Sequence, residues 1–475
     1  MLLALLAGGV DQTAMAALLP AIIREFALPF DRLDEAAWAV TLYLGAYAAV
    51  LALAGRAVDR GAGIAVRIGA IVLFGIGSIG SALSQDIWPL IASRTVQGLG
   101  AGVLVPLALA EAASASDPDR RLKRLGVVML VAEGGAVLGP LYGAAILAVT
   151  DWRWAFWLNV PVVLALLGAW GPRLRAADLV RLWRSARASD LLVGIAVGTT
   201  IVGISREGVR HGAWIPWASV AVAIAALVLA ARLAGWHLSG ARAGPAAAIA
   251  AHLCLGVALI TPLVLVPVWA STLLGRSPAA AALVLLRLML AVPPCALIGA
   301  FVATRLGRRA VAGGGFLLAA IGLAVMSRWS AGIGEDGMTP ALVIAGAGFG
   351  LLLSPTIETL IARDDAHENA TRLGWATAAR VVGMAVGLAA MTTWGIDRLT
   401  ERLRSLSLPL PIGGEDAATF AARVESYRRA ATDIGIEIFG TLFVVGAIAA
   451  VLGAVAAIAA VRSASAQRAG RRSPT

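Results

Sequence analysis

The sequence predicts an all-α protein that crosses a membrane many times, and three observations support this fold class. Of the 475 residues 59% are hydrophobic, and the mean hydropathy is +0.85. Only 14% of the residues are charged, against about 25% in soluble domains. Apolar runs near the ~20 residues that a helix needs to cross a bilayer recur along the whole chain. These features exclude an ordinary soluble protein.

Fourteen apolar runs can be marked, and each is expected to form one transmembrane helix. The seventh and eighth are short and bordered by Arg206, Glu207, Arg210 and His211, and a single re-entrant pair in their place would reduce the count to twelve. The runs lie near residues 2–23, 36–57, 67–84, 88–113, 126–149, 155–170, 190–206, 215–232, 247–272, 279–303, 310–327, 340–361, 373–396 and 434–462.

The net charge of +11 is carried by Arg, since Lys123 is the only lysine. The Arg residues gather in alternate loops, as the positive-inside rule describes. We therefore assign the charge to topology, with both termini in the cytoplasm, and not to a nucleic-acid partner. Cys254 and Cys295 fall inside apolar runs, so neither a disulfide nor a metal site is expected. Without a phosphate-binding loop or a nucleophile–base motif, the sequence predicts no enzyme and no cofactor.

An internal repeat divides the chain into two halves. Residues 98–111 read GLGAGVLVPLALAE and residues 346–358 read GAGFGLLLSPTIE, each with three alternating glycines, then Pro, then Glu. Halves of this kind usually form parallel repeats with the substrate site between them near the midplane. The expected units are an N-terminal six-helix half at 1–170, a linker with two extra helices at 171–244, a C-terminal six-helix half at 245–462 and a cytoplasmic tail at 463–475.

Three charged residues stand out because they interrupt apolar runs: Asp11, Glu133 and Arg380. On insertion scales each costs roughly 2.5–3.5 kcal/mol at the membrane centre. Counted from the inner face at ~1.5 Å per residue, all three lie roughly 10–14 Å deep, which permits an interaction. A carboxylate holds its proton more weakly beside an Arg than away from it, so separating such a pair would load a proton. A static buried ion pair is the alternative.

Other charges are less informative. Arg287 is also in mid-span, where snorkelling or pairing explains it as well as function does. His252 is a candidate proton carrier, although a lone His on an apolar helix is usually hydrogen-bonded locally. Glu111, Glu358 and Glu437 lie near the membrane faces and are expected to be solvated.

Several motifs resemble those of the major facilitator superfamily, specifically its fourteen-helix drug:proton antiporters of the EmrB/QacA type. The first run, VDQTAMAALLP, and the junction DWRWAFWLNVP at 151–161 are similar to theirs. Further matches are Arg94, Gln97 and Gly98 in the fourth run, Gly126, Gly135, Gly139, Pro140 and Gly143 of the antiporter motif in the fifth, and Gly55, Asp59 and Arg60 of the cytoplasmic gating motif.

The resemblance implies a major facilitator fold with two inserted helices, powered by a proton gradient. It implies proton coupling by Asp11 and Glu133, and for Arg94 a role in proton transfer or in the contact between the first and fourth runs. The gating motif after Arg60 departs from the family, because its later Gly and basic pair are missing.

A closer likeness is to mycobacterial exporters of lipids and drugs that are encoded beside a lipid-carrying lipoprotein. The strings VLGPLYG (137–143) and AARVVGMAVGLAAMTTWG (378–395) are similar to theirs. That resemblance implies two helices projecting into the periplasm at about 397–433; an ordinary exposed loop is the alternative. The chain departs from those exporters at 328–339, where they carry a longer outer insertion.

The sequence therefore predicts a proton-coupled exporter of drugs or lipids in the bacterial inner membrane, working by alternating access. Its partners would be a hydrophobic or amphipathic compound, protons, membrane lipids and a periplasmic lipoprotein. A non-transporting receptor or scaffold and an inward proton symporter are the alternatives.

Overall fold

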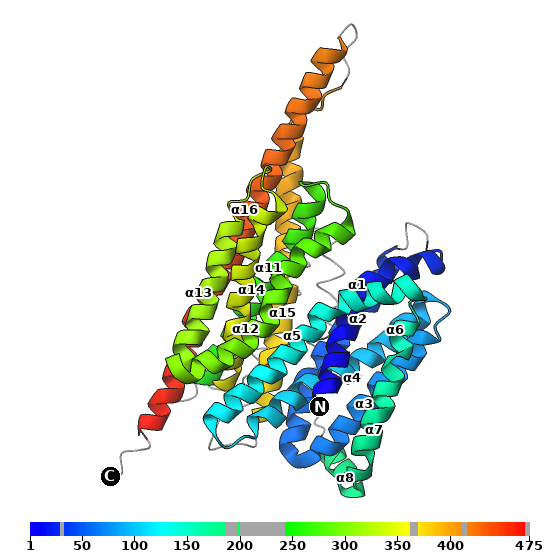
Figure 1. Ribbon diagram of the computed structural model, residues 1–475, viewed down its shortest axis with the longest axis vertical. Coiled ribbons are helices and arrows are strands. Elements are labelled where there is room, and N and C mark those ends of the chain that lie inside the picture. Colours follow the sequence, from blue (N-terminus) through cyan, green and yellow to red (C-terminus); the bar gives the residue numbers. More distant parts are fainter. Residues whose placement is uncertain (29–32, 186–197, 199–242, 362–368, 411–415, 471–475) are drawn as a thin grey trace.

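In the computed structural model, residues 1–28, 33–185, 198, 243–361, 369–410 and 416–470 are described, and the account below concerns these. Every regular element in this part of the chain is helical. The helices form two sets that pack side by side (Figure 1).

The first set contains the helices before residue 186. They are α1 (Leu2–Glu25), α2 (Leu33–Ala57), the π-helical turn η2 (Val58–Ala62), α3 (Gly63–Ala82), α4 (Ile87–Ala113), α5 (Pro118–Val149), α6 (Trp154–Trp157), α7 (Asn159–Trp170), the 3-10 turn η3 (Gly171–Arg173) and α8 (Ala176–Ser185). Short loops carry the caps: the Asp117 carboxylate accepts from the Arg120 N–H at 2.8 Å, directly before Pro118 at the first position of α5. Asp and Pro favour this role because the first-turn N–H groups have no helical partner.

The second set follows residue 242. Its helices are α11 (Ala243–Thr272), α12 (Pro278–Leu306), α13 (Arg308–Met326), α14 (Glu335–Glu358), α15 (Asn369–Arg404) and α16 (Ala417–Gly470).

Among the described residues, eleven helical segments are long and apolar enough to cross a membrane, and one of them, Trp38–Ala82, covers both α2 and α3. The protein is thus a multi-pass membrane protein with about twelve apolar helices in its described part. The predicted runs at 190–206 and 215–232 lie almost wholly outside the described residues, so the count of fourteen stays a prediction.

The Gly-rich repeat has the same packing in both sets. A Cβ atom on Gly98 or Gly102 would overlap backbone of α2, and one on Gly100 would overlap α3. The equivalent overlaps in the second set are of Gly346 and Gly350 with α12 and of Gly348 with α13. Because three alternating glycines let α4 and α14 each touch two neighbours at backbone distance, the repeat visible in the sequence is a repeat of helix packing.

The two sets are in contact at the lower end of the molecule in Figure 1, where α8 and the C-terminus lie. A Cβ on Gly55 of α2 would overlap the Ala370 carbonyl of α15, and one on Gly126 of α5 would lie 2.6 Å from Ala300 Cβ of α12. Small residues therefore bring the halves together here.

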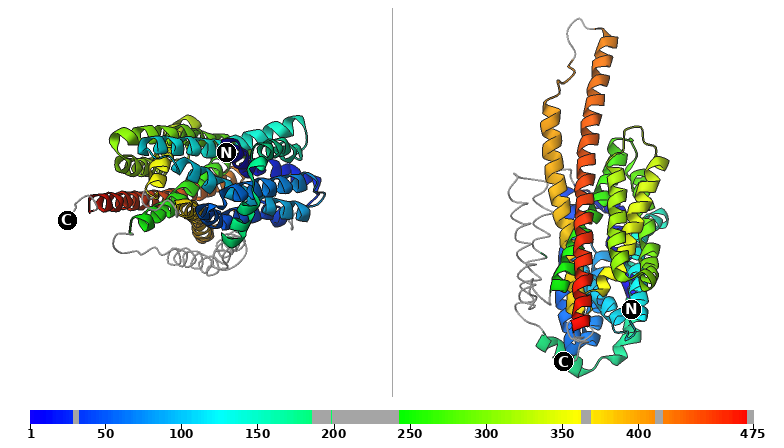
Figure 2. Two further views of the ribbon diagram at one scale, coloured as in Figure 1. Left: turned by 90° about the horizontal axis from the view of Figure 1, so that it is seen from below. Right: turned by 90° about the vertical axis from the view of Figure 1, so that its left-hand side faces the viewer.

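Helices α15 and α16 rise side by side beyond all the other helices at the opposite end, as the right view of Figure 2 shows. Arg402 of α15 and Glu437 of α16 form an ion pair at 2.9 Å. Farther out, the Arg423 guanidinium donates to the Leu410 carbonyl at 2.6 Å. These contacts join the chain on either side of residues 411–415, which are outside the described part.

Candidate functional site

A central cavity of about 200 Å³ lies between the two sets. Its wall is formed by helices of both sets and is mostly aliphatic, with Leu5, Leu109, Val137, Leu259 and Leu353 among the lining residues. An apolar wall with few polar groups is typical of sites that bind hydrophobic ligands.

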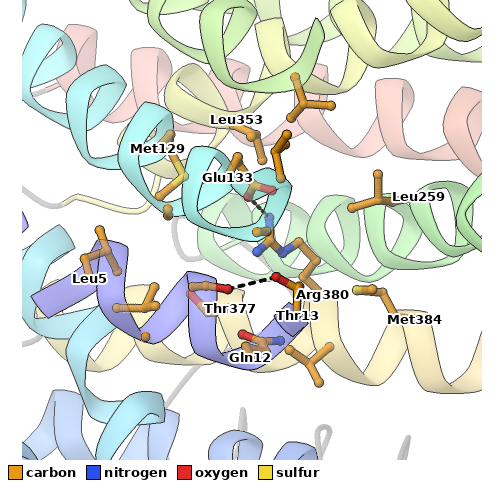
Figure 3. Close-up of a pocket in the computed structure, with 18 of the residues that line it drawn as sticks. Leu5, Gln12, Thr13, Met129, Glu133, Leu259, Leu353, Thr377, Arg380 and Met384 are labelled. Carbon is orange, nitrogen blue, oxygen red and sulfur yellow. Dashed lines mark hydrogen bonds and ion pairs between the residues drawn. The ribbon is translucent and has the colours of Figure 1, made fainter. Parts of the chain in front are cut away.

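Glu133 and Arg380 face each other in the wall of this cavity (Figure 3). Arg380 Nη1 donates to Glu133 Oε1 at 2.7 Å, and the two side chains are 23% and 15% exposed. Glu133 belongs to α5 and Arg380 to α15, so the ion pair joins the two halves. Arg380 is held in place because α15 packs closely on α11, where a Cβ on Gly256 would overlap the Arg380 carbonyl.

Asp11 lies in a separate polar cluster within the first set. Its carboxylate accepts from Arg94 at 2.5 Å, from the Gln97 amide at 2.9 Å and from the Asn159 amide at 3.0 Å. The Gln97 amide also donates to the Ser78 hydroxyl at 2.8 Å. All these residues are buried, and the Arg94 guanidinium stacks 4.1 Å from the centre of the Tyr43 ring. Three donors therefore satisfy this buried carboxylate within the N-terminal set of helices.

The structure thus divides the three charges that the sequence grouped by depth. Arg380 pairs with Glu133, and Asp11 pairs with Arg94 from the motif in α4. Asn159 and Ser78 were not singled out as site residues, although Asn159 belongs to the matched junction at 151–161. A lone amide inside an apolar run was the signal that could have identified Asn159.

Three of the four antiporter-motif glycines lie where α5 packs on α1, whereas Gly126 packs on α12. A Cβ on Gly139 would overlap the Thr13 hydroxyl and lie 2.5 Å from the Val10 carbonyl, and one on Gly135 would lie 2.9 Å from the Leu6 carbonyl. Gly143 approaches the Ala14 carbonyl in the same way. The motif therefore sets the distance between α1 and α5.

Replacing Gly139 by Ala is expected to destabilise the protein by about 1–3 kcal/mol, because the methyl group meets backbone atoms that cannot move aside. Gly134→Ala on the same helix is the matched control, since its Cβ would meet only Pro293 Cβ, at 4.0 Å. Unfolding of both variants in mixed SDS micelles measures the difference. Equal stability of the two variants would contradict this account of the motif.

The cytoplasmic gating motif caps a helix of the other half. The Asp59 carboxylate in η2 accepts from the Ala370 N–H at 2.9 Å, the Thr371 N–H at 2.8 Å and the Thr371 hydroxyl at 2.6 Å. These N–H groups belong to the first turn of α15, where a negative charge is favourable. Arg60 follows Asp59 in η2, and Gly61 takes a left-handed conformation with φ of 85°.

Glu358 is buried, which corrects the expectation that it is solvated. It is 2% exposed, accepts a hydrogen bond from Arg121 of α5 at 2.9 Å and forms an ion pair with Arg308 of α13 at 2.8 Å. Glu111 and Glu437 are solvated as expected, with side chains 50% and 62% exposed. Nearness to a membrane face suggested solvation, but Arg121 from the other half covers Glu358.

Neutralising Glu358 is expected to open the halves at this end. Hydrogen bonds to charged groups contribute about 1.5–3 kcal/mol, so Glu358→Gln should raise the separated population about tenfold or more. Spin labels at the exposed positions Arg120→Cys and Arg309→Cys, with Cys254 and Cys295 replaced by Ala, report that distance.

The control for this measurement is Glu111→Gln at the equivalent position of the repeat. Glu111 bonds Arg67 of its own half at 3.1 Å, so its loss leaves the contact between halves intact. An unchanged distance distribution in Glu358→Gln would show that this cluster does not hold the halves together.

Arg287 of α12 has partners on α14, and His252 has one within its own helix. Arg287 pairs with Glu335 at 2.9 Å and bonds the Thr339 hydroxyl at 2.7 Å, at the start of α14. His252 Nδ1 bonds the Ala248 carbonyl one turn earlier at 2.8 Å, and its ring lines the central cavity. Within the described ranges, no group of three His, Cys, Asp or Glu residues is placed to hold a metal ion.

Comparison with known families identifies the superfamily to which these two sets of helices belong. The family model described as Major Facilitator Superfamily matches residues 1–388. The chain belongs to the major facilitator superfamily. It is therefore a membrane transporter and not an enzyme, and the two sets of helices are the two halves of that fold.

Similar members of the superfamily come from mycobacteria. A triacylglyceride transporter of Mycolicibacterium smegmatis is 31% identical over 477 residues, covering 95% of this chain and 85% of that protein. A triacylglyceride transporter of Mycobacterium tuberculosis is 31% identical over 482 residues, covering 95% of this chain and 92% of that protein.

Solved structures of the superfamily share the fold at low sequence identity. A proton:xylose symporter, XylE, matches with a TM-score of 0.58 and 16% identity, over 94% of this chain and 93% of that one. The human organic anion transporter MFSD10 matches with a TM-score of 0.57 and 13% identity, over 94% and 97%.

Proposed function

We propose that this member of the superfamily exports a neutral, triacylglyceride-like lipid across a bacterial inner membrane, driven by proton entry. One observation carries the proposal: an ion pair between the halves, Glu133–Arg380, lies in the wall of an otherwise largely apolar cavity. The names of the mycobacterial relatives support a lipid as the cargo. Proton antiport and the fourteen-helix subtype come from the family resemblance.

The apolar wall favours a cargo without charge. A charged or highly polar solute would leave its water shell for aliphatic side chains, which costs several kcal/mol without compensating polar groups. A cationic drug would need a carboxylate in the cavity wall to bind its charge. Glu133 lies there, but it is already paired with Arg380. An amphipathic drug cation is therefore the second candidate cargo.

The ion pair supplies a way to couple protons to movement of the halves. When Glu133 is ionised, Arg380 holds α15 against α5. Protonation removes the charge that attracts Arg380, so proton binding and separation of the two helices favour each other. Energy would come from the proton gradient, without a cofactor. We propose Asp11 as a second proton-binding carboxylate, which acts inside the N-terminal half because its partner Arg94 is there.

The direction of the molecule in the membrane follows from its charges. The helical turns that carry Arg60, Arg120 and Arg309 lie at one end of the molecule, and from the positive-inside rule we propose that this end and both termini face the cytoplasm. The halves meet at that end, so the structure corresponds to a state closed toward the cytoplasm. The projecting parts of α15 and α16 then lie in the periplasm.

The projecting helices are proposed to hand lipid to a periplasmic lipoprotein. Replacing residues 400–430 by a short Gly/Ser linker is expected to abolish lipid transfer to a soluble acceptor, because the path beyond the membrane surface is removed. Transfer of radiolabelled triacylglyceride from proteoliposomes measures this loss. Proton flux in the same vesicles is the control for folding, and undiminished lipid transfer would exclude this role.

The proposed function is tested with purified protein in liposomes that contain a pH-sensitive dye. Triacylglyceride and amphipathic cations are added separately, with and without an imposed pH gradient. Lipid movement that requires the gradient and moves protons in the opposite direction supports the exporter, and movement in the same direction as protons supports the symporter. Absence of flux with every compound favours a scaffold.

A further inference from the structure

Helix α8 presents two opposite faces. At about 100° per residue, Asp178 lies on the side opposite to Val180 and Trp183, and Leu182 lies between Asp178 and Leu179. Asp178 is 7% exposed and accepts from the Arg175 N–H at 3.0 Å, while Leu182 packs against the core cluster of the N-terminal half. This side rests on η2 and α3.

The opposite face is apolar and uncovered. Leu179 is 52% exposed, Val180 49% and Trp183 84%. In water, these apolar side chains on the outer face of the ten-residue helix would stay exposed, which is unfavourable. An exposed apolar face bordered by basic residues is typical of helices that lie in the plane of a membrane surface.

Basic residues lie beside the apolar face. Arg181 and Arg184 follow Val180 around the helix, Arg175 directly precedes the first residue of α8, and all three residues are exposed. Arg181 contacts Asp178 at 3.5 Å, yet its own side chain remains 58% exposed. Each basic residue near an anionic membrane surface contributes about 1 kcal/mol of attraction, so the chemistry selects anionic over zwitterionic lipid.

The position of α8 agrees with a place at the membrane boundary. The apolar segment Trp154–Arg173 ends directly before it. The Trp170 ring there lies 3.9 Å from the Arg67 guanidinium and 4.8 Å from that of Arg173, measured to the ring centre. Aromatic rings beside Arg are typical of the interface between acyl chains and headgroups. Figure 1 places α8 at the end of the molecule where the halves meet.

We propose that α8 is an interfacial anchor that binds anionic phospholipid of the adjacent leaflet. Leu179, Val180 and Trp183 enter the acyl region, and Arg175, Arg181 and Arg184 bind the headgroup phosphates. This inference does not depend on the cargo or on proton coupling.

The test uses full-length protein that carries bimane at Leu179→Cys, with Cys254 and Cys295 replaced by Ala. The protein is reconstituted in phosphatidylethanolamine vesicles that contain either phosphatidylglycerol or phosphatidylcholine with brominated acyl chains, and iodide is the aqueous quencher. Quenching by brominated lipid, stronger for phosphatidylglycerol, is the expected result. Quenching by iodide alone, or shielding from both quenchers by protein, overturns the proposal.

Charge variants test the headgroup contact. Arg181→Gln with Arg184→Gln should lower the ratio of phosphatidylglycerol to phosphatidylcholine quenching about fivefold for each Arg removed, the factor that ~1 kcal/mol gives. The corresponding Lys variants should retain the preference, which distinguishes lost charge from lost folding. Arg428→Gln with Arg429→Gln is the matched control, since these exposed residues lie on the projecting part of α16. An unchanged ratio in the α8 variant overturns the proposal.

Discussion

Glu133→Gln is expected to abolish cargo-driven proton flux while leaving the protein folded. Gln has nearly the same shape and still accepts a hydrogen bond from Arg380, but it carries no charge and binds no proton at neutral pH. Loss of a charged hydrogen bond of about 1.5–3 kcal/mol should shift the balance between joined and separated helices about 10- to 150-fold. Dye-reported proton flux in liposomes measures the first effect.

The control is Glu437→Gln, which removes a carboxylate of the same kind that is 62% exposed and paired with Arg402 outside the cavity. Its flux should equal that of the wild type. If Glu133→Gln retained flux, the coupling carboxylate would lie elsewhere, and Asp11→Asn would be the next variant. Lipid movement without proton flux in Glu133→Gln would show uncoupled transport, which also identifies Glu133 as the coupling residue.

Asp11→Ala is expected to give the largest loss of stability, about 3–5 kcal/mol, because it leaves the buried Arg94 charge without its counter-ion. Arg94 is 1% exposed, and Gln97 and Asn159 lose an acceptor at the same time. Unfolding in mixed SDS micelles measures the change.

A double variant distinguishes a lost ion pair from a general packing defect. Asp11→Ala with Arg94→Met removes both charges, so it should be more stable than Asp11→Ala alone. Glu437→Ala, which breaks an exposed pair, should cost less than about 1 kcal/mol. A double variant as unstable as the sum of its two single variants would show that the two residues do not act on each other.

The repeat and the membrane helices were predictable because their signals are local. Three alternating glycines before Pro and Glu are visible in the letters at 98–111 and 346–358, and the packing of α4 and α14 follows from them. Charges inside apolar runs are equally visible, since each has a high insertion cost. Asp11, Glu133 and Arg380 were therefore identifiable without a structure.

The partners of those charges were not predictable. Depth along a helix can be counted from sequence, but the direction in which a side chain points depends on how each helix is rotated against its neighbours. Asp11 and Glu133 lie at similar depth, yet Asp11 points to Arg94 inside one half and Glu133 to Arg380 of the other. For Arg94 the family resemblance implied a contact between the first and fourth runs, but no local pattern linked its side chain to Asp11.

The sequence by itself determined that this protein is a two-halved, all-α membrane transporter with charges at the midplane, because hydropathy, repeats and insertion cost are properties of short segments. Only the tertiary structure decided which charges join the halves. Glu133–Arg380 and Arg121–Glu358 each bring together residues more than two hundred positions apart. Such pairs form by the packing of one half on the other, and no local pattern encodes that contact.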